Sequence, residues 1–261
     1  MDIIRIIAVL FIKDGLIVRS QSFSRHQYLG NVIEQAKRLN DYNVDELVYV
    51  DISRSSEYDL KRDDLRIKSK RDIITIIQDI SKVCFMPLTF GGKIRNTNDA
   101  VKMIRAGADK IIINNLLIND QEEVRTIVKN LGSQAVVGSI DYKCSEGECF
   151  VFKNFGKENT NIKLSDFLKK AEDLGVGEIF LQNIDFDGKQ NGFDIQNIKN
   201  CVDKVSVPLV ACSGAGRAEH FIDALKIKNI SGVAAGNVFN YTERSYPTIK
   251  NEIKKKFKNV R

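Results

Sequence analysis

The sequence predicts an α/β protein, a single (β/α)₈ TIM barrel built as a twofold repeat of half-barrels. Apolar, β-branched runs alternate with helical-period segments along the chain, as expected for parallel strands that are buried on both faces. The 261 residues are 43% hydrophobic, which suits one large core of barrel size. We therefore expect one domain over residues 1–261, with half-barrels at approximately 1–130 and 131–261.

Eight strands and the helices between them are expected in chain order. The strands are predicted at Ile3–Ile12, Glu46–Ile52, Met86–Phe90, Lys110–Asn114, Gln134–Ile140, Glu178–Ile184, Val207–Ala211 and Gly232–Ala235. Helices are predicted at Asn31–Tyr42, Thr97–Ala106, Glu122–Leu131, Leu164–Leu174 and Ala218–Lys226. A last amphipathic helix is predicted from Ile249, Ile253 and Phe257, which recur at i, i+4 and i+8.

The two halves of the chain contain similar segments in the same order. Asp45–Leu47 opens the second strand and Gly177–Ile179 opens the sixth. Phe11 and Asp141 stand at matching ends of strands one and five. Recurrence in order at similar separations indicates a repeated four-strand unit, and chance similarity among βα units is the alternative.

Composition and charge argue against two classes of partner. The net charge is +6, and much of the excess lies at 61–71 and 254–258. These stretches lack aromatic interleaving and a recognition motif, so we expect no nucleic-acid partner. No apolar run reaches the length of a membrane helix, and the N-terminal segment is typical of a first strand rather than a signal peptide, so no membrane partner is expected.

The cysteines indicate a reducing environment. The five are Cys84, Cys144, Cys149, Cys201 and Cys212, an odd number without a CxxC pair. This pattern argues against a disulfide framework and against a zinc site. We therefore expect a cytoplasmic protein with no metal and no cofactor.

Small residues follow several strands at the end of the barrel where active sites form. These are Gly91-Gly92 after strand three, Asn114-Asn115 after strand four, Ser213–Gly216 after strand seven and Gly236-Asn237 after strand eight. Glycines allow backbone N–H groups to approach phosphate oxygens, and a helix start adds a positive dipole. Their pairing across the repeat predicts a phosphorylated small-molecule substrate with a phosphate at each end, although glycine turns are common in ordinary loops.

Polar residues at other strand ends are expected to face the same mouth. They are Asp51, Thr89, Asp141, Gln182, Asp187 and Cys212. A carboxylate among apolar neighbours is suited to general acid or base catalysis, and a helix cap or loop brace is the alternative for each. Asp141, alone at the end of an apolar strand, is the favoured catalytic candidate.

Four charged residues precede or open strands one, two, four and six, near the bottom of the barrel. They are Arg5, Glu46, Lys110 and Glu178. Charges at that depth are costly unless they are paired, and two acids with two bases can form one neutral ring. The alternative is four separate surface salt bridges.

These features resemble the cyclase subunit of imidazole glycerol phosphate synthase, the HisF type. The resemblance covers nearly the whole chain and rests on DELVYVDI (45–52), PLTFGG (87–92), RAGADKIIIN (105–114), GSQAVVGSID (132–141), GVGEIFLQNIDFDG (175–188), NGFD (191–194) and SGAGRAEHF (213–221). It implies a HisH-like class I glutaminase on the barrel bottom, next to Asp109, and ammonia that passes up through the core. It implies an ammonia gate and a set of phosphate- or substrate-binding residues. The gate is Arg5, Glu46, Lys110 and Glu178, and the binding set is Gly91, Gly92, Asn114, Asn115, Asp187, Gly188, Gly214, Gly236 and Asn237.

The chain departs from the family at its acid–base pair. The family uses two aspartates at the ends of strands one and five, and this chain has Asp141 but Phe11 at the first position. Losing one of two cooperating groups costs several orders of magnitude in rate. Other departures are Lys93 for a third glycine, Cys212-Ser213 for Ser-Gly, Gln182 for Thr, Arg19 for a mobile-loop Lys, and an insertion within Ser53–Arg71.

Three functions follow from the resemblance and its departures. The first is an ammonia-conducting HisF-type subunit with altered cyclase chemistry. It would supply a third enzyme, an amidotransferase of acetamidino sugars, in nucleotide-sugar and surface-polysaccharide (lipopolysaccharide) biosynthesis. The second is the cyclase, a lyase, of L-histidine biosynthesis. The third is a non-catalytic scaffold that binds phosphorylated ligands. The kept gate beside a missing acid favours the first.

Overall fold

The structure is a computed structural model that describes residues 3–55, 58 and 72–261. In these ranges, parallel strands close into one barrel. In barrel order they are β1 (Arg5–Lys13), β4 (Glu46–Asp51), β5 (Leu88–Gly91), β6 (Lys110–Ile113), β7 (Val136–Ser145), β10 (Glu178–Asn183), β11 (Leu209–Cys212) and β12 (Gly232–Ala235). The pairings β1–β12 and β7–β10 complete the closed sheet. The predicted (β/α)₈ barrel is confirmed, and its division into half-barrels stays a prediction.

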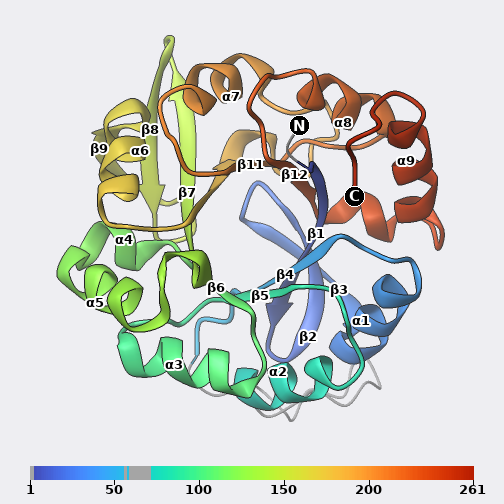
Figure 1. Cartoon of the computed structure of the whole chain (residues 1–261), viewed down its shortest axis with the longest axis horizontal. Coiled ribbons are helices and arrows are strands. Elements are labelled where there is room, and N and C mark those ends of the chain that lie inside the picture. Colours follow the sequence, from blue (N-terminus) through green and yellow to red (C-terminus); the bar gives the residue numbers. More distant parts are fainter. Residues whose placement is uncertain (1–2, 56–57, 59–71) are drawn as a thin grey trace.

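Helices surround the strands, as Figure 1 shows. They are α1 (Val32–Asp41), α2 (Ile73–Ser81), α3 (Thr97–Ala106), the short α4 (Asn115–Asn119), α5 (Gln121–Leu131), α6 (Leu164–Asp173), α7 (Ile195–Val202), α8 (Ala218–Leu225) and α9 (Ser245–Lys254). In the last helix Ile249 and Ile253 are buried and Phe257 packs against the core just beyond it, as the amphipathic pattern predicts. Asn31, Asp72 and Asn96 cap three of the helices by accepting backbone N–H hydrogen bonds.

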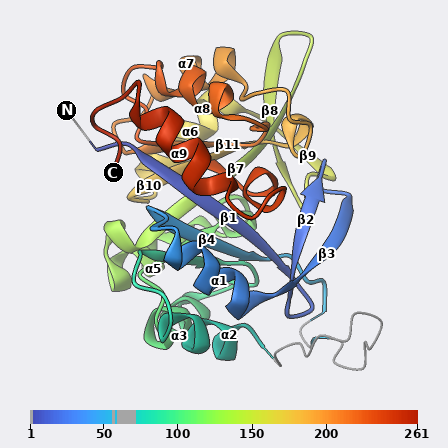
Figure 2. The same cartoon turned by 90° about the vertical axis from the view of Figure 1, so that its right-hand side faces the viewer.

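Two antiparallel hairpins extend the barrel at its upper end, which is the end where the strands finish. β2 (Leu16–Gln21) and β3 (Arg25–Asn31) follow β1, and β8 (Glu148–Lys153) and β9 (Glu158–Lys163) follow β7. Figure 2 shows both hairpins on the side away from the N- and C-termini. The strands that carry Phe11 and Asp141 therefore continue past the barrel into hairpins that the sequence reasoning did not predict.

Two apolar layers form the core. The larger layer lies between the strands and the helices. The smaller layer fills the barrel interior with Ile7, Val9, Val48, Ile112, Val137, Phe180, Val210, Cys212 and Ala234, and Phe11 and Val50 pack against it. The interior is therefore an apolar column that runs up to Phe11.

One expectation about the cysteines is wrong. Cys144 and Cys149 form a disulfide across the β7–β8 hairpin, while Cys84, Cys201 and Cys212 are free and buried. The two bonded residues stand directly opposite each other in the antiparallel register. Their proximity follows from the hairpin, so it was hidden as long as the hairpin was not predicted.

The expectations about metal sites, membrane helices and the insertion can be compared with the described residues only. Within those residues, no group of three or more His, Cys, Asp or Glu side chains is placed to hold a metal ion. In the same residues, no helix has the length and apolar character needed to cross a membrane. The insertion predicted within Ser53–Arg71 and the basic stretch at 61–71 lie mostly or wholly outside the described residues.

Candidate functional site

Four charged side chains close a ring at the lower end of the barrel, where the strands begin. Arg5 on β1 pairs with Glu46 on β4 at 2.7 Å and also with Glu178 on β10. Lys110 on β6 pairs with the same two carboxylates, at 3.2 Å to Glu46 and 2.8 Å to Glu178. Because each cation contacts both anions, the contacts form one neutral ring and not four separate surface bridges.

Burial and ion pairing shift the pKa values of this ring in opposite directions. Burial raises the pKa of Glu178, but the hydrogen bonds and charges of Arg5 and Lys110 outweigh burial and hold that pKa below its ordinary value. Burial lowers the pKa of Arg5, but Glu178 and Glu46 outweigh it and raise that pKa. The contacts therefore favour the charged form of these side chains.

Thr89 belongs to this ring and not to the mouth, which corrects the prediction for it. Its hydroxyl donates to Glu46 at 3.0 Å, and the side chain is buried. β5 has only four residues, and Thr89 is the second of them. On so short a strand, the second residue lies at the lower end of the barrel, while Gly91 lies at the upper end.

A cavity of about 570 Å³ opens at the upper end of the barrel. It brings together many of the predicted site residues, namely Phe11, Asp51, Gly92, Asn114, Asn115, Asp141 and Gln182. Gly91 packs behind it, since a Cβ on Gly91 would lie 2.4 Å from the backbone oxygen of Ile112. Arg19 does not line this cavity in the described part of the chain, and its guanidinium instead donates across the hairpin to Gln27.

Asp141 is the titratable group best suited to chemistry in this cavity. It lies on β7 beside Gln182 of β10. Burial, and then repulsion from Asp187, raise its pKa to about 7. A carboxyl group that titrates near neutral pH can act as acid or base. At the matching end of β1 the cavity meets Phe11, whose side chain cannot transfer a proton.

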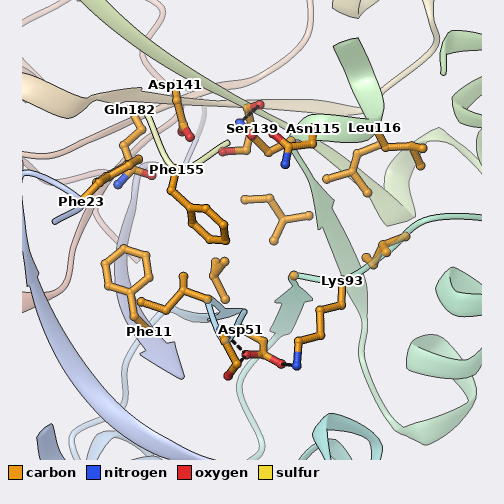
Figure 3. Close-up of a pocket in the computed structure, with 18 of the residues that line it drawn as sticks. Phe11, Phe23, Asp51, Lys93, Asn115, Leu116, Ser139, Asp141, Phe155 and Gln182 are labelled. Atoms are coloured by element: carbon orange, nitrogen blue, oxygen red, sulfur yellow. Dashed lines mark hydrogen bonds and ion pairs between the residues drawn. The ribbon is translucent and has the colours of Figure 1, made fainter. Parts of the chain in front are cut away.

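Asp51 and Lys93 form an ion pair on another wall of the cavity. The Lys93 Nζ lies 3.2 Å from Asp51 Oδ2 and 4.7 Å from the centre of the Tyr58 ring. The carboxylate also accepts hydrogen bonds from the Tyr58 hydroxyl at 2.8 Å and from the backbone N–H of Ser53 at 2.9 Å. Figure 3 shows this pair and Asp141 on opposite sides of the cavity.

The turn of the β8–β9 hairpin reaches over the cavity. Asn115 donates to the Asn154 side chain at 3.3 Å and accepts from the Asn154 backbone at 3.0 Å. Phe155 follows with a φ of 61° and remains 43% exposed. In Figure 3 its ring projects between Asp141 and Phe11. Asn114, which also lines the cavity, donates to the backbone oxygen of Ser139 at 3.0 Å.

The second glycine region surrounds a much smaller pocket of about 20 Å³. Its lining contains the predicted residues Asp187, Gly188, Gly214, Gly236 and Asn237, together with Cys212 and Ser213. Gly214 has a φ of 94°, and a Cβ there would lie 2.0 Å from the Gly192 backbone oxygen, so only glycine fits. Burial raises the pKa of Asp187 despite hydrogen bonds from Ser20 and the Phe23 backbone.

Sequence reasoning missed the cavity residues that the two hairpins supply. Ser20, Phe23 and His26 come from the β2–β3 hairpin, and Phe155 comes from the β8–β9 turn. One signal was present: Asp14-Gly15 lies between two apolar runs, and both residues have positive φ. An Asp-Gly pair in that position is typical of a two-residue hairpin turn.

Comparisons with known proteins agree with this geometry. A model of the histidine biosynthesis protein family matches residues 5–245. The imidazole glycerol phosphate synthase subunit HisF of Saccharolobus solfataricus is 34% identical over 90% of both chains. The HisF proteins of Hydrogenobaculum sp. and Natranaerobius thermophilus are 34% and 35% identical over 98% of both chains. The chain therefore belongs to the histidine biosynthesis protein family and, within it, to the HisF type.

Proposed function

We propose that the chain is the HisF-type subunit of a glutamine amidotransferase complex and conducts ammonia from a HisH-like class I glutaminase to its upper cavity. The ring of Arg5, Glu46, Lys110 and Glu178 carries this proposal. It lies at the lower entrance of the barrel interior, and all four charges are balanced within it. A ring of ion pairs can open and close around a small polar molecule without leaving a charge unpaired.

The barrel interior above the ring suits ammonia rather than ammonium. Side chains such as Ile7, Val48, Val210 and Ala234 line it and are apolar. An isolated cation in such surroundings carries a large desolvation cost, whereas a small neutral molecule does not. The apolar column leads from the ring to Phe11 and the upper cavity.

Exposed apolar side chains at the lower end support a docked partner there. Phe85, just before β5, is 87% exposed, and Ile3, just before β1, is 65% exposed. The Phe85 backbone N–H donates to Asn40 at 3.0 Å, so the loop is held while its aromatic ring faces solvent. Buried aromatic anchors are typical of the centres of protein interfaces.

The upper cavity supports altered cyclase chemistry. Phe11 stands where the family has an acid, and Asp141 alone carries a titratable group at the two matching strand ends. We propose that ammonia leaves this cavity for an acceptor enzyme, a third amidotransferase of acetamidino-sugar and surface-polysaccharide biosynthesis. The substitution at position 11 is the reason for proposing an outside acceptor of ammonia in place of ring closure in the cavity itself.

A second candidate is the cyclase of L-histidine biosynthesis. One observation favours it: the pKa of Asp141 is raised to about 7, which suits a single group that both accepts and donates a proton near neutral pH. In that case the missing acid would be supplied by the substrate or by water. The two candidates differ in the rate of imidazole glycerol phosphate formation.

The test mixes the barrel with its glutaminase, glutamine and the substrate of HisF cyclases, a bis-phosphorylated ribulosyl intermediate. We expect glutamate to form, and imidazole glycerol phosphate to form at least about a hundredfold more slowly than with a HisF cyclase measured in parallel. Phe11→Asp should raise that rate. Imidazole glycerol phosphate formation at the rate of the parallel cyclase would establish the histidine-pathway function instead.

The ring is tested in the same mixture. Lys110→Met should change the stimulation of glutamine hydrolysis by the barrel. Lys250→Met is a matched control, because Lys250 is also partly buried and pairs with Asp45 but lies outside the ring. Equal effects of both variants on glutamine hydrolysis would contradict the assignment of the ring to the ammonia path.

A further inference from the structure

The two glycine-rich ends of the upper site differ in the volume that they leave open. The end at Gly92 and Asn114 opens on the cavity of about 570 Å³, whereas the end at Gly214 and Gly236 holds about 20 Å³. A pocket of the smaller size has room for about one water molecule. A phosphate group is several times larger than water and does not fit there.

The β2–β3 hairpin closes the smaller end. The Ser20 hydroxyl donates to Asp187 at 2.8 Å, and the Phe23 backbone N–H donates to the same carboxylate at 3.2 Å. Asn237 accepts from the Ser20 backbone N–H at 3.3 Å and donates to the Ser20 backbone oxygen at 2.6 Å. Asp187 and Asn237 are thus already engaged by the hairpin, while the buried hydroxyl of Ser213 in the same pocket has no hydrogen-bond partner among the described residues.

Lys93 gives the larger end a positive charge. It has a φ of 60°, in the left-handed region that disfavours residues with a side chain. A lysine ammonium has three N–H donors. Among the described residues, Asp51 takes one donor and the Tyr58 ring lies against another side of the ammonium, while 24% of the lysine side chain stays accessible. One donor therefore remains for a ligand in the cavity.

The Asp51 carboxylate does not depend on Lys93 alone. It accepts from the Ser53 hydroxyl and backbone N–H at 2.5 and 2.9 Å, and from the Tyr58 hydroxyl at 2.8 Å. These neutral donors leave the charge of Asp51 unchanged, but they keep its carboxylate hydrogen-bonded when the Lys93 ammonium contacts a ligand. Arg54 and Arg95 line the same cavity and add positive potential.

The rings of Phe11 and Phe155 line one part of the cavity, next to the polar side chains of Asp141 and Gln182. Phe11 packs against the interior column, and the Phe155 ring projects into the space between Phe11 and Asp141 (Figure 3). A flat, uncharged group would fit against these rings. The charges that favour an anion lie on the other side of the cavity, at Lys93.

We propose that the upper cavity binds a ligand with a single anionic group, which Lys93 holds, and an uncharged, flat body that packs on Phe11 and Phe155. This assignment rests on the proposed function, since it names the ligand class of the same upper cavity. It departs from a substrate with a phosphate at each end, because the hairpin occupies the second end. Lys93 is then the residue that determines specificity.

The test measures binding to the barrel alone by calorimetry, with phenyl phosphate as the probe. We expect one phenyl phosphate per chain, bound about tenfold or more tightly than inorganic phosphate, because the ring adds apolar contact. Hydroquinone bisphosphate, which has the same ring and a second phosphate, should gain no more than about the twofold statistical factor. A tenfold gain for the bisphosphate, or equal affinity for inorganic and phenyl phosphate, would overturn the assignment.

Two variants of the ion pair separate binding from structure. Lys93→Met should weaken phenyl phosphate about tenfold or more, since it removes a charged donor. Asp51→Asn should tighten it, because Lys93 would lose its opposing charge. Lys226→Met, an exposed lysine paired with Asp223, is the control and should change nothing. If both ion-pair variants weaken binding, or if Lys93→Met binds as the unaltered chain does, Lys93 has only a structural role.

The outcome is independent of the glutaminase. Asp51→Asn gives an interpretable result even if Lys93→Met fails to fold, because a purely structural pair predicts no gain in affinity. Failure of ammonia transfer in the complex would contradict the proposed function and leave these affinities unchanged. Loss of phenyl phosphate binding with intact ammonia transfer would contradict only the ligand assignment.

Discussion

Removal of Lys110 from the ring should destabilise the isolated barrel strongly. Lys110 lies 3.2 Å from Glu46 and 2.8 Å from Glu178, whose side chains are only 4% and 9% exposed. Breaking a buried pair costs roughly 3–5 kcal/mol because the remaining charge is left without its partner. The Lys110 side chain itself is 21% exposed, which lets water screen part of the loss. We therefore expect Lys110→Met to lower the free energy of unfolding by about 3 kcal/mol.

A second substitution tests whether the charges act as one ring. Glu178→Gln in the Lys110→Met background restores neutrality, since Arg5 and Glu46 remain paired at 2.7 Å. The free energy of unfolding of the double variant should exceed the value expected from adding the two single effects by about 1–2 kcal/mol. Lys226→Met, which breaks an exposed pair, should cost less than about 1 kcal/mol.

The assay is urea unfolding of the barrel at neutral pH, followed by circular dichroism. The same experiment at low pH reports on Glu178, whose folded pKa lies below the ordinary value of 4.5. Its contribution is present above that value and is lost as the pH falls through the folded pKa. Glu178→Gln should remove this part of the acid loss. A cost below about 1 kcal/mol for Lys110→Met, or strictly additive effects in the double variant, would refute the ring.

Three further predictions concern other parts of the molecule. Asp141 has a folded pKa of about 7 against an ordinary value of 3.8, so the free energy of unfolding falls as the pH rises through that window. Asp141→Asn should lack this fall. Urea unfolding at pH 4 and at pH 8 should show the free energy of unfolding of the variant rising by up to about 4 kcal/mol relative to that of the unaltered chain. Replacing Cys144 and Cys149 together by Ser should cost about 2 kcal/mol and abolish any effect of dithiothreitol on the melting temperature, and a double variant that still responds to the reductant would contradict this. Phe85→Ser should keep the free energy of unfolding within about 0.5 kcal/mol of that of the unaltered chain, since the Phe85 residue is 87% exposed. The same variant should weaken binding of the proposed glutaminase about tenfold or more in a titration.

The barrel strands could be predicted from the sequence because they are buried on both faces. The run at Gly232–Ala235 has the bounds that were expected, and Glu178–Asn183 differs by one residue. β7 was predicted to end at Ile140, but it continues to Ser145 because it pairs with β8. Apolar runs mark the part of a strand inside the barrel and carry no information on a polar extension.

The hairpins were harder to predict for a physical reason. β9, with the sequence ENTNIK, is largely exposed and has almost no apolar residues, so nothing in its pattern separates it from a loop. The disulfide and the placement of Phe155 depend on these hairpins and were missed with them. The candidate site was predicted where it sits on barrel strands, and it was missed where it sits on hairpins.

The misplacement of Thr89 has a related cause. Residue type suggested a polar side chain at the mouth, but the level of a residue along the barrel axis depends on where its strand begins. Thr89 pairs with Val48 and Lys110 in the register of its neighbours, which fixes it near the ring. Register comes from contacts between strands and could not be obtained from one strand alone.

The ring also bears on how such a barrel can be divided. A cut after residue 130 would place Arg5, Glu46 and Lys110 in the first fragment and Glu178 in the second. The first fragment would then hold an unmatched positive charge in its concave face, and the second an unmatched negative one. Each fragment would be the counter-ion of the other, so mixed fragments should join as one-to-one pairs in preference to pairs of identical fragments.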